Sequence, residues 1–574
     1  MTKPLLFSLA LALMVHGGFA STAKACGGFF CNRSQPVNQA AERIIFSHNE
    51  DGTTTAMIQI LYSGPSENFA WMLPVNGSPD ISVSSNSAFQ QIQRATNPSY
   101  RLNVEVEGEC DQNDFGPFPG SAGQDASFGA DAGASSDAGA PPVTVVDEGS
   151  VGPYDFVIIS VDQAAEDIAL VATEWLQENE YDVSELGRDR LVPYLESGMN
   201  LLAFRLTKGR DTGEIRPVVL SFGAGLPSIP LRPTAAAATP DMGIMVFVLG
   251  ESRAIPANYL DLELNEARLN WFNASSNYNQ VVTQAANEAG GQGFVTEFAG
   301  DAGFLEERIF PAGIAERWTR IQEEEDDFSL LSETAFAFQG WDGLLEVFLA
   351  ELTKPESISE EFWAADPLNA IREDYYNNTE PPYEGPILEG LDRASFAARM
   401  EAEVIAPVRE TAELFQGGRT MTRLYTTMSP EEMTMDPVFD FNAELPDYSN
   451  THTARQIIEC GRGIMRNEAG WRVVLDNGVT IRGNASNWPL ANSEMPAMAT
   501  ARRVGNTGNG EVIMSNAAAI VSAVNANNVA NPRIYPRGLI AGGGCSVSTG
   551  SGLGGAGFGA LLLLGAALWR RRRA

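Results

Sequence analysis

The stretch from 113 to 148 most constrains how this chain folds, because it offers almost nothing to bury. Its central part reads GSAGQDASFGADAGASSDAGAPP. A segment this poor in large apolar side chains cannot offset the entropy lost on ordering. We therefore expect a disordered acidic insertion, with the folded body built from the sequence on either side. Its aspartates lack the regular glycine–aspartate nonapeptide period of calcium-binding β-rolls, which argues against that alternative.

Length and charge set further limits. The chain has 574 residues and exceeds what one hydrophobic core supports, so about two to four domains are expected. Its 73 acidic and 38 basic residues give a formal net charge of −35. This balance excludes nucleic acid as a partner, because phosphate recognition needs clustered Lys and Arg. Acidity of this kind favours solubility through self-repulsion over a calcium or cationic-partner role.

The N-terminal 25 residues have the pattern of a secretory signal peptide. Lys3 supplies the positive charge, an apolar run follows from Leu5 to Val15, and Ala23-Lys24-Ala25 fits the small-x-small cleavage rule. Cleavage after Ala25 would leave Cys26 first in the mature chain, as in lipoproteins. The residues before Cys26 match a lipobox poorly, so lipidation there is the weaker alternative.

The C-terminal end has the pattern of a membrane anchor. Gly552 to Trp569 is an uncharged run of helical length just sufficient for a thin hydrocarbon core. A cationic cluster follows, which the positive-inside rule keeps on the cytoplasmic side. Its members are Arg570, Arg571, Arg572 and Arg573.

Cys545, the apolar run and the arginine cluster stand in the order of a known sorting signal. The ending resembles the myxobacterial C-terminal sorting tail (MYXO-CTERM). The resemblance implies cleavage near Cys545 by a membrane sorting protease, transfer to the cell surface and a lipid on this cysteine. A plain single-span anchor with an incidental cysteine is the alternative.

Four cysteines remain in the body: Cys26, Cys31, Cys110 and Cys460. An even number of cysteines in an exported chain predicts disulfides, and three connectivities are open. Cys26–Cys31 is the natural local bridge because Gly27 and Gly28 allow a tight turn, and Cys110–Cys460 would then join distant parts. A zinc site in the CGGFFC word lacks a second ligand pair. No metal or cofactor is predicted.

Hydrophobic patterning predicts an α+β fold with mixed strands and helices in two or three subdomains. It predicts a hairpin of strands Glu42–Ser47 and Thr53–Tyr62 around the turn 49–52, a helix at Asn86–Thr96, core strands at Phe69–Val75 and 154–161, and a hairpin turn at Asn477-Gly478. Strands with short connections outnumber helices between 150 and 270, which argues against a doubly wound sheet. We expect these parts: 1–25 signal peptide, 26–112 mostly β, 113–148 insertion, 149–274 α+β, 275–418 mostly helical, 419–503 β-rich, 504–544 linker and 545–574 sorting and transmembrane tail.

Three sequence motifs in the body resemble those of a bacterial family without an assigned function. They are CGGFFC with QPVNQAAERIIF (26–46), NFAWMLPV (68–75) and TRLYTTMSPEEMTMDPVF (422–439). They are similar to the domain-of-unknown-function family 2330. The resemblance implies a secreted or envelope-associated protein and carries no activity or catalytic residue.

Catalytic chemistry has little support in the residues. The chain has three histidines, and His16 lies in the predicted signal peptide. His452 and Cys460 are close in sequence, with Asp436 or Asp447 as a possible orienting acid for a Cys-His hydrolase. Cys460 is expected to be oxidised, however, and the stretch HTARQIIECGRG is predicted to form a short helix ending at Gly461. No GxSxG, HExxH or Walker motif is present.

The sequence therefore predicts an exported protein, anchored in the cell envelope or at the outer surface, with a structural or binding role. Its membrane contact is the C-terminal helix or a lipid at Cys545. The alternative is a secreted surface hydrolase of unknown substrate. His48, beside the turn at 49–52, is expected to be exposed, and the catalytic residues and the ligand stay open.

Overall fold

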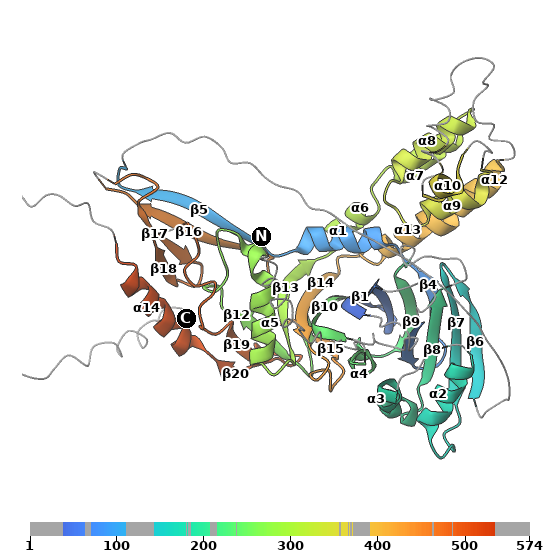
Figure 1. Cartoon of the computed structure of the whole chain (residues 1–574), viewed down its shortest axis with the longest axis horizontal. Helices are drawn as coiled ribbons and strands as arrows, with labels where there is room; N and C mark the ends of the chain where they lie inside the picture. The colour runs from blue at the N-terminus through green and yellow to red at the C-terminus, as the bar shows by residue number, and fades with distance from the viewer. Residues whose placement is uncertain are drawn as a thin grey trace, which may run out of the picture.

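The computed structural model describes residues 38–533, except for 64–69, 111–142, 180, 182–184, 207–214, 237, 355–357, 366, 368–369, 371–390, 462–463 and 485. Within these residues the fold is mixed α+β, with several sheets and separate helical layers (Figure 1). The predicted signal peptide and the tail from 545 lie outside them. No helix in the described ranges has both the length and the apolar character needed to cross a membrane.

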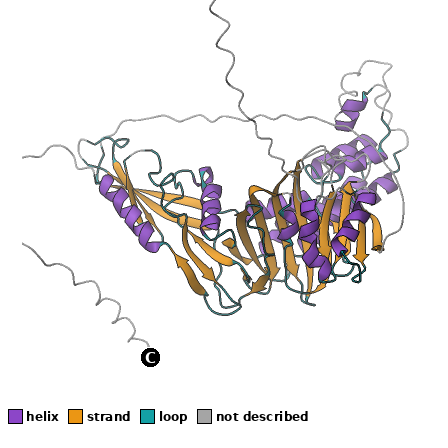
Figure 2. Ribbon diagram, turned by 60° about the horizontal axis from the view of Figure 1, so that its bottom comes forward, coloured by secondary structure: helices purple, strands orange, loops and turns teal. Residues whose placement is uncertain are grey.

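A ten-stranded sheet runs through the centre of the molecule (Figure 2). In sheet order, its strands are β20 (Glu511–Ser515), β19 (Met498–Arg503), β12 (Leu260–Leu264), β13 (Gly293–Asp301), β14 (Thr420–Met428), β10 (Ala238–Gly250), β1 (Asn38–His48), β2 (Thr53–Ser63), β9 (Val218–Ala224) and β4 (Asp80–Val83).

Strand β1 shows how the sequence builds this sheet. It forms the predicted hairpin with β2 and pairs in parallel with β10, so that Ile44 lies opposite both Ile58 and Val246. Because successive side chains point to opposite faces, Ile44 and Ile45 enter different cores. Both faces of the sheet are therefore covered.

One covered face packs against a four-stranded sheet of order β3-β8-β7-β6. The predicted core words lie here, with Trp71 on β3 and Ile158 on β7 both buried. The elements of this layer are β3 (Ala70–Val75), β6 (Val143–Val151), β7 (Tyr154–Val161), β8 (Asn200–Leu206), α2 (Ile168–Glu178), α3 (Glu185–Glu196) and α4 (Leu231–Thr234).

The other face is covered by helices, and a helical lobe follows. Phe89 of α1 and Leu305 of α6 share one buried core with Ile45 of β1. The lobe has its own core around Trp318 and Phe338. The helices are α1 (Asn86–Thr96), α6 (Gly303–Ile309), α7 (Ile314–Gln322), α8 (Asp327–Ala337), α9 (Leu344–Glu351), α10 (Glu360–Ala365), α12 (Arg393–Arg399), a π-helix (Met400–Ile405) and α13 (Ala406–Glu413).

A second four-stranded sheet, called the distal sheet below, lies at the opposite end from the helical lobe (Figure 1). Its order is β18-β17-β16-β5, and the predicted Asn477-Gly478 turn joins β17 to β18. The elements of this end are β5 (Ser99–Glu107), β16 (Thr451–Glu459), β17 (Gly470–Leu475), β18 (Thr480–Gly483), η3 (Ala274–Ser276), α5 (Tyr278–Glu288) and α14 (Ala517–Ala530). A two-stranded pair joins β11 (Ala254–Pro256) to β15 (Phe439–Phe441).

Several expected segments differ in the structure. The 504–544 linker contains β20 and α14, because Ile520 and Val524 have a core to enter and are buried. The 113–148 insertion overlaps β6, whose residues from Val143 pair with β7. The mostly helical part contains β13, which pairs with β14. The ten-stranded sheet thus combines strands from five of the expected parts.

Candidate functional site

The predicted cysteines are placed only in part. Cys110 and Cys460 form a disulfide across 350 residues of sequence, and Cys460 is buried. This connects the end of β5 to the end of β16, which run in parallel in the distal sheet. Cys26, Cys31, Cys545 and the four terminal arginines lie outside the described residues.

The predicted helix around His452 is wrong, because Thr451–Glu459 forms strand β16 between β5 and β17. The Cys-His pairing is also wrong, since Cys460 is oxidised. His452 Nδ1 lies 2.7 Å from Glu266 Oε1, and its ring stacks on Tyr100 at 4.6 Å. Neither of the predicted orienting acids, Asp436 or Asp447, is its partner: Asp436 accepts hydrogen bonds from Tyr194 and Arg232 instead.

His48 was expected to be exposed, but it is half-buried at the end of β1. Its ring packs 5.4 Å from Phe441, and Nδ1 lies 3.5 Å from Thr54 Oγ1. An aromatic neighbour from β15, nearly 400 residues away in the chain, covers the imidazole. No reactive partner for this histidine is present among the described residues.

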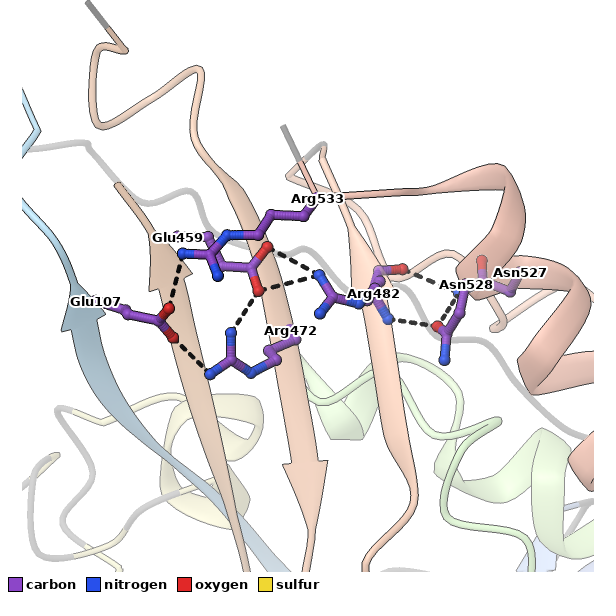
Figure 3. Close-up of polar contacts among 7 residues, drawn as sticks. All are labelled: Glu107, Glu459, Arg472, Arg482, Asn527, Asn528 and Arg533. Carbon is purple, nitrogen blue, oxygen red and sulfur yellow. Dashed lines mark hydrogen bonds and ion pairs between the residues drawn. The ribbon is translucent and has the colours of Figure 1, made fainter. Parts of the chain in front are cut away.

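An ion-pair cluster lies beside the disulfide (Figure 3). The Glu459 carboxylate, whose side chain is 1% exposed, accepts from Arg482 Nη1 at 2.9 Å and also from Arg472. Arg472 also donates to the Glu107 carboxylate, at 2.6 Å. Arg533 donates to the Glu107 carboxylate at 2.7 Å. Each carboxylate thus receives two guanidinium groups, which is the arrangement of a stabilising network and not of an open binding site.

Helix α14 completes this end by covering the free edge of β18 (Figure 3). Asn527 Nδ2 donates to the Arg482 carbonyl at 2.9 Å, and Asn528 Oδ1 accepts from the Arg482 N–H at 2.8 Å. Asn528 Nδ2 also donates to the Thr480 carbonyl at 2.7 Å. The two side-chain amides take the place of a neighbouring strand and protect an edge that could otherwise pair with another chain.

A cleft at the opposite end is the candidate binding site. It has a volume of about 470 Å³, which lies in the range of small-molecule sites. Its walls come from the β4 strand and the β6–β7 turn on one side and from α9, α12, the π-helix and α13 on the other. None of its lining residues is histidine or cysteine.

Arg216 lines this cleft and is its most unusual residue. The side chain is buried, with 7% exposed. Its Nε donates to the Ser84 carbonyl at 3.1 Å and its Nη1 to the Glu403 carbonyl at 2.9 Å, while buried Nη2 has no hydrogen-bond partner among the described residues. Burial lowers the pKa of Arg216, and the nearby Asp342 and Glu346 carboxylates act in the opposite direction. A buried guanidinium without a paired anion is costly to maintain.

Local backbone features bring the walls of the cleft close to Arg216. Gly343 has φ 87°, and a Cβ at this position would lie 2.8 Å from the Glu403 carbonyl oxygen and 3.3 Å from Arg216 Nη1. Glu403 belongs to the π-helix, a rare geometry that occurs often at functional sites. A larger residue at 343 would therefore push the π-helix away from Arg216.

One feature of the sequence weakly indicates this site. Arg216 stands in the apolar stretch EIRPVVLSF, where a charge is unexpected beside a buried strand. The π-helix and the pairing of residues near 83, 216 and 403 depend on tertiary packing, so no local pattern could identify the cleft.

Comparison with known protein families places the chain. Residues 20–334 match the family described as an uncharacterized protein conserved in bacteria (DUF2330). The chain belongs to DUF2330. The motifs at 26–46 and 68–75 lie inside the match, and so does Arg216. The motif at 422–439 lies outside it. No curated protein and no solved structure matches the chain.

Among the described residues, no group of three or more His, Cys, Asp or Glu side chains could hold a metal ion. The DUF2330 match ends before the C-terminal tail, so the sorting-tail resemblance rests on the tail residues alone.

Proposed function

We propose that this DUF2330 protein is an exported binding protein tethered at the cell surface through its C-terminal tail. The observation that carries the exported location is the Cys110–Cys460 disulfide. Structural disulfides persist in oxidising compartments and are rare in the reducing cytosol. The signal-peptide pattern at 1–25 and the tail at 545–574 support the same assignment from the sequence.

Binding is favoured over hydrolysis by the contents of the cleft. A Ser or Cys nucleophile needs an adjacent base. Ser82 and Ser150 line the cleft, but no histidine does. His452 is occupied by Glu266 and Tyr100 in the distal part of the molecule. The residues of the cleft are suited to holding a ligand by charge and shape.

The tether is tested by replacing the predicted sorting cysteine. Cys545→Ala is expected to leave an uncleaved form that still ends at Ala574, seen by intact mass and peptide mapping of the cell-envelope fraction. Ser546→Ala is the matched control and should be processed like the parent. An unchanged mass and location of Cys545→Ala would contradict the sorting proposal.

The exported location has its own test. Protein trapped directly from native cells with a thiol-alkylating reagent should leave Cys110 and Cys460 unlabelled unless a reductant is added first. Ready labelling of either cysteine without reductant would contradict an oxidising location. Peptide mass spectrometry of the two cysteine-containing peptides gives the answer for each site separately.

A further inference from the structure

We propose that the cleft beside Arg216 binds a small zwitterion, with the ligand carboxylate at Arg216 and the ligand ammonium at Glu346. This inference rests on the proposed binding function and names the chemical class of its ligand. Its basis is the distribution of paired and unpaired charge around the cleft.

Arg216 lacks an anionic partner among the described residues. The two acceptors of its side chain, the Ser84 and Glu403 carbonyl oxygens, are both neutral. The guanidinium forms no ion pair with any carboxylate in the described part of the chain, and Nη2 is left without an acceptor. A carboxylate from a ligand would supply both the charge and the hydrogen bond, since arginine binds this group with matched planar geometry.

Arg216 is held in place before any ligand binds. The backbone N–H of Arg216 donates to the Tyr154 hydroxyl at 3.0 Å, and that hydroxyl donates to the Arg216 carbonyl at 2.6 Å. Tyr154 is itself buried in the sheet core. With its backbone and two side-chain nitrogens fixed, Arg216 loses little conformational entropy when a ligand binds.

The carboxylates around the cleft differ in whether they already have a partner. Glu403 in the cleft wall is already neutralised by Arg399, whose Nε lies 2.9 Å from Glu403 Oε1. Asp342, which also acts on Arg216, accepts hydrogen bonds from Ser85 and Asn86. Glu346 lines the cleft half-buried and has no hydrogen bond or ion pair with a described residue. Glu410 also lines the cleft without such a partner, but its side chain is exposed. The half-buried Glu346, which acts on Arg216, is therefore the carboxylate assigned to a ligand ammonium group.

The balance of charges selects a zwitterion over a simple anion. The whole chain carries a net charge of −35, which repels free anions from its surface. A ligand with an ammonium group avoids this repulsion and pairs with Glu346, while its carboxylate reaches the buried guanidinium. The cleft volume of about 470 Å³ accommodates a molecule of dipeptide size.

The experiment uses dialanine as the probe, with N-acetyl-dialanine and dialanine amide as its two blocked forms, measured by calorimetry on the purified mature protein. Dialanine is expected to bind, and each blocked form to bind about tenfold more weakly, because each loses one charge-assisted contact. Equal binding of dialanine and its amide would overturn the carboxylate assignment. No binding of dialanine at millimolar concentration would overturn the proposal.

Variants of Arg216 and Glu346 test which residue binds the carboxylate of dialanine and which binds its ammonium group. Arg216→Met should weaken dialanine about tenfold and no longer distinguish it from the amide, whereas Arg216→Lys should retain part of the difference. Glu346→Gln should no longer distinguish dialanine from its N-acetyl form. Arg409→Met is the matched control, since Arg409 pairs with Glu401 at the surface and does not line the cleft.

The outcome is separable from that of the proposed function. Unfolding in urea checks that each variant is folded, so that lost binding is not lost structure. A variant pattern that does not follow the blocked forms would place the ligand elsewhere. Tethering is tested separately, by the mass of the C-terminal tail. A tethered protein need not bind dialanine, and dialanine binding does not require the tether.

Discussion

The distal sheet and the cleft each bury charge, and they do so differently. At the distal sheet the Glu459 carboxylate receives two guanidinium groups, and Glu107 receives two more contacts from Arg472 and Arg533. At the cleft the Arg216 guanidinium donates to two neutral carbonyls and forms no ion pair with a carboxylate of the described residues. The strands of the distal sheet lie toward one end of the molecule, and helices α9 and α13, which line the cleft, lie toward the other (Figure 1). A buried charge with its partners in place stabilises the fold, whereas one without them indicates where an outside partner belongs.

The largest expected effect comes from the covalent link of the distal sheet. Replacing both Cys110 and Cys460 with Ser should lower the free energy of unfolding by about 4 kcal/mol, because the bridge closes a very long loop. Urea unfolding with and without reductant measures the loss. Reductant should lower the parent to the level of the variant and leave the variant unchanged. An unchanged midpoint would mean that the distal sheet does not depend on its bridge.

The second largest loss of stability is expected when the Glu459 carboxylate, which pairs with two arginines, is neutralised. Glu459→Gln should destabilise the protein by about 3 kcal/mol, because it leaves Arg472 and Arg482 facing a neutral group in a buried position. Glu105→Gln on the neighbouring strand is the control. Its pair with Arg455 is 3.6 Å long and half-exposed, so the loss should stay below about 0.5 kcal/mol. Equal losses in urea unfolding would break the distinction between buried and exposed pairs.

Glu42 is a buried carboxyl group without an ion-pair partner among the described residues, and it is the acidic counterpart of Arg216. It is 4% exposed on β1, its Oε2 has no partner among the described residues, and burial raises its pKa to about 7. The folded state therefore holds a proton that the unfolded state releases near pH 4.5. Stability should fall as the pH rises from about 4.5 to 7 and then level off, with a total loss of about 3 kcal/mol.

The variant Glu42→Gln should lack this pH dependence and be the more stable protein at pH 8. Urea unfolding at pH 5, 6, 7 and 8 tests both statements, with exposed Glu148→Gln as a control that should follow the parent. Parallel curves for the parent and Glu42→Gln would show that Glu42 is ionised in the folded protein. The comparison with Arg216 is then sharper, because an arginine cannot lose its charge in this way.

The smallest effect is expected at the cleft. Arg216→Met in the ligand-free protein should change stability by no more than about 1 kcal/mol, since the loss of two hydrogen bonds is offset by removing an uncompensated charge. Arg472→Met should cost about 2 kcal/mol, because it breaks pairs with Glu107 and Glu459. If urea unfolding gives similar losses for the two variants, paired and unpaired arginines do not differ in the way described.

Local patterns predicted the parts of the fold that depend on neighbours in sequence. The hairpin of β1 and β2, the helix at Asn86–Thr96 and the turn at Asn477-Gly478 all follow from alternation, helical spacing or turn chemistry. The cysteine count predicted disulfides in the body and kept Cys110–Cys460 among the open pairings.

The wrong predictions share one physical cause, which is stabilisation from distant residues. Strand β16 is specified by its parallel pairing with β5, about 350 residues earlier, and not by its own weak pattern. Helix α14 contains several asparagines, which are poor helix formers, yet Asn527 and Asn528 bond to the edge of β18. Arg216 was missed for the same reason, because its surroundings come from four separated segments, which contain Ser84, Tyr154, Gly343 and Glu403.

The disulfide between Cys110 and Cys460 also determines what happens when a protease cuts the chain. A single cut in the Ala/Gly/Asp-rich insertion that starts just after Cys110 would divide the polypeptide in two, but the halves would stay covalently joined. Both halves contribute strands to the ten-stranded sheet, so the nicked molecule would keep its core as well. A chain built in this way keeps its two halves together after cleavage in the insertion, and the cut becomes visible only on a reducing gel.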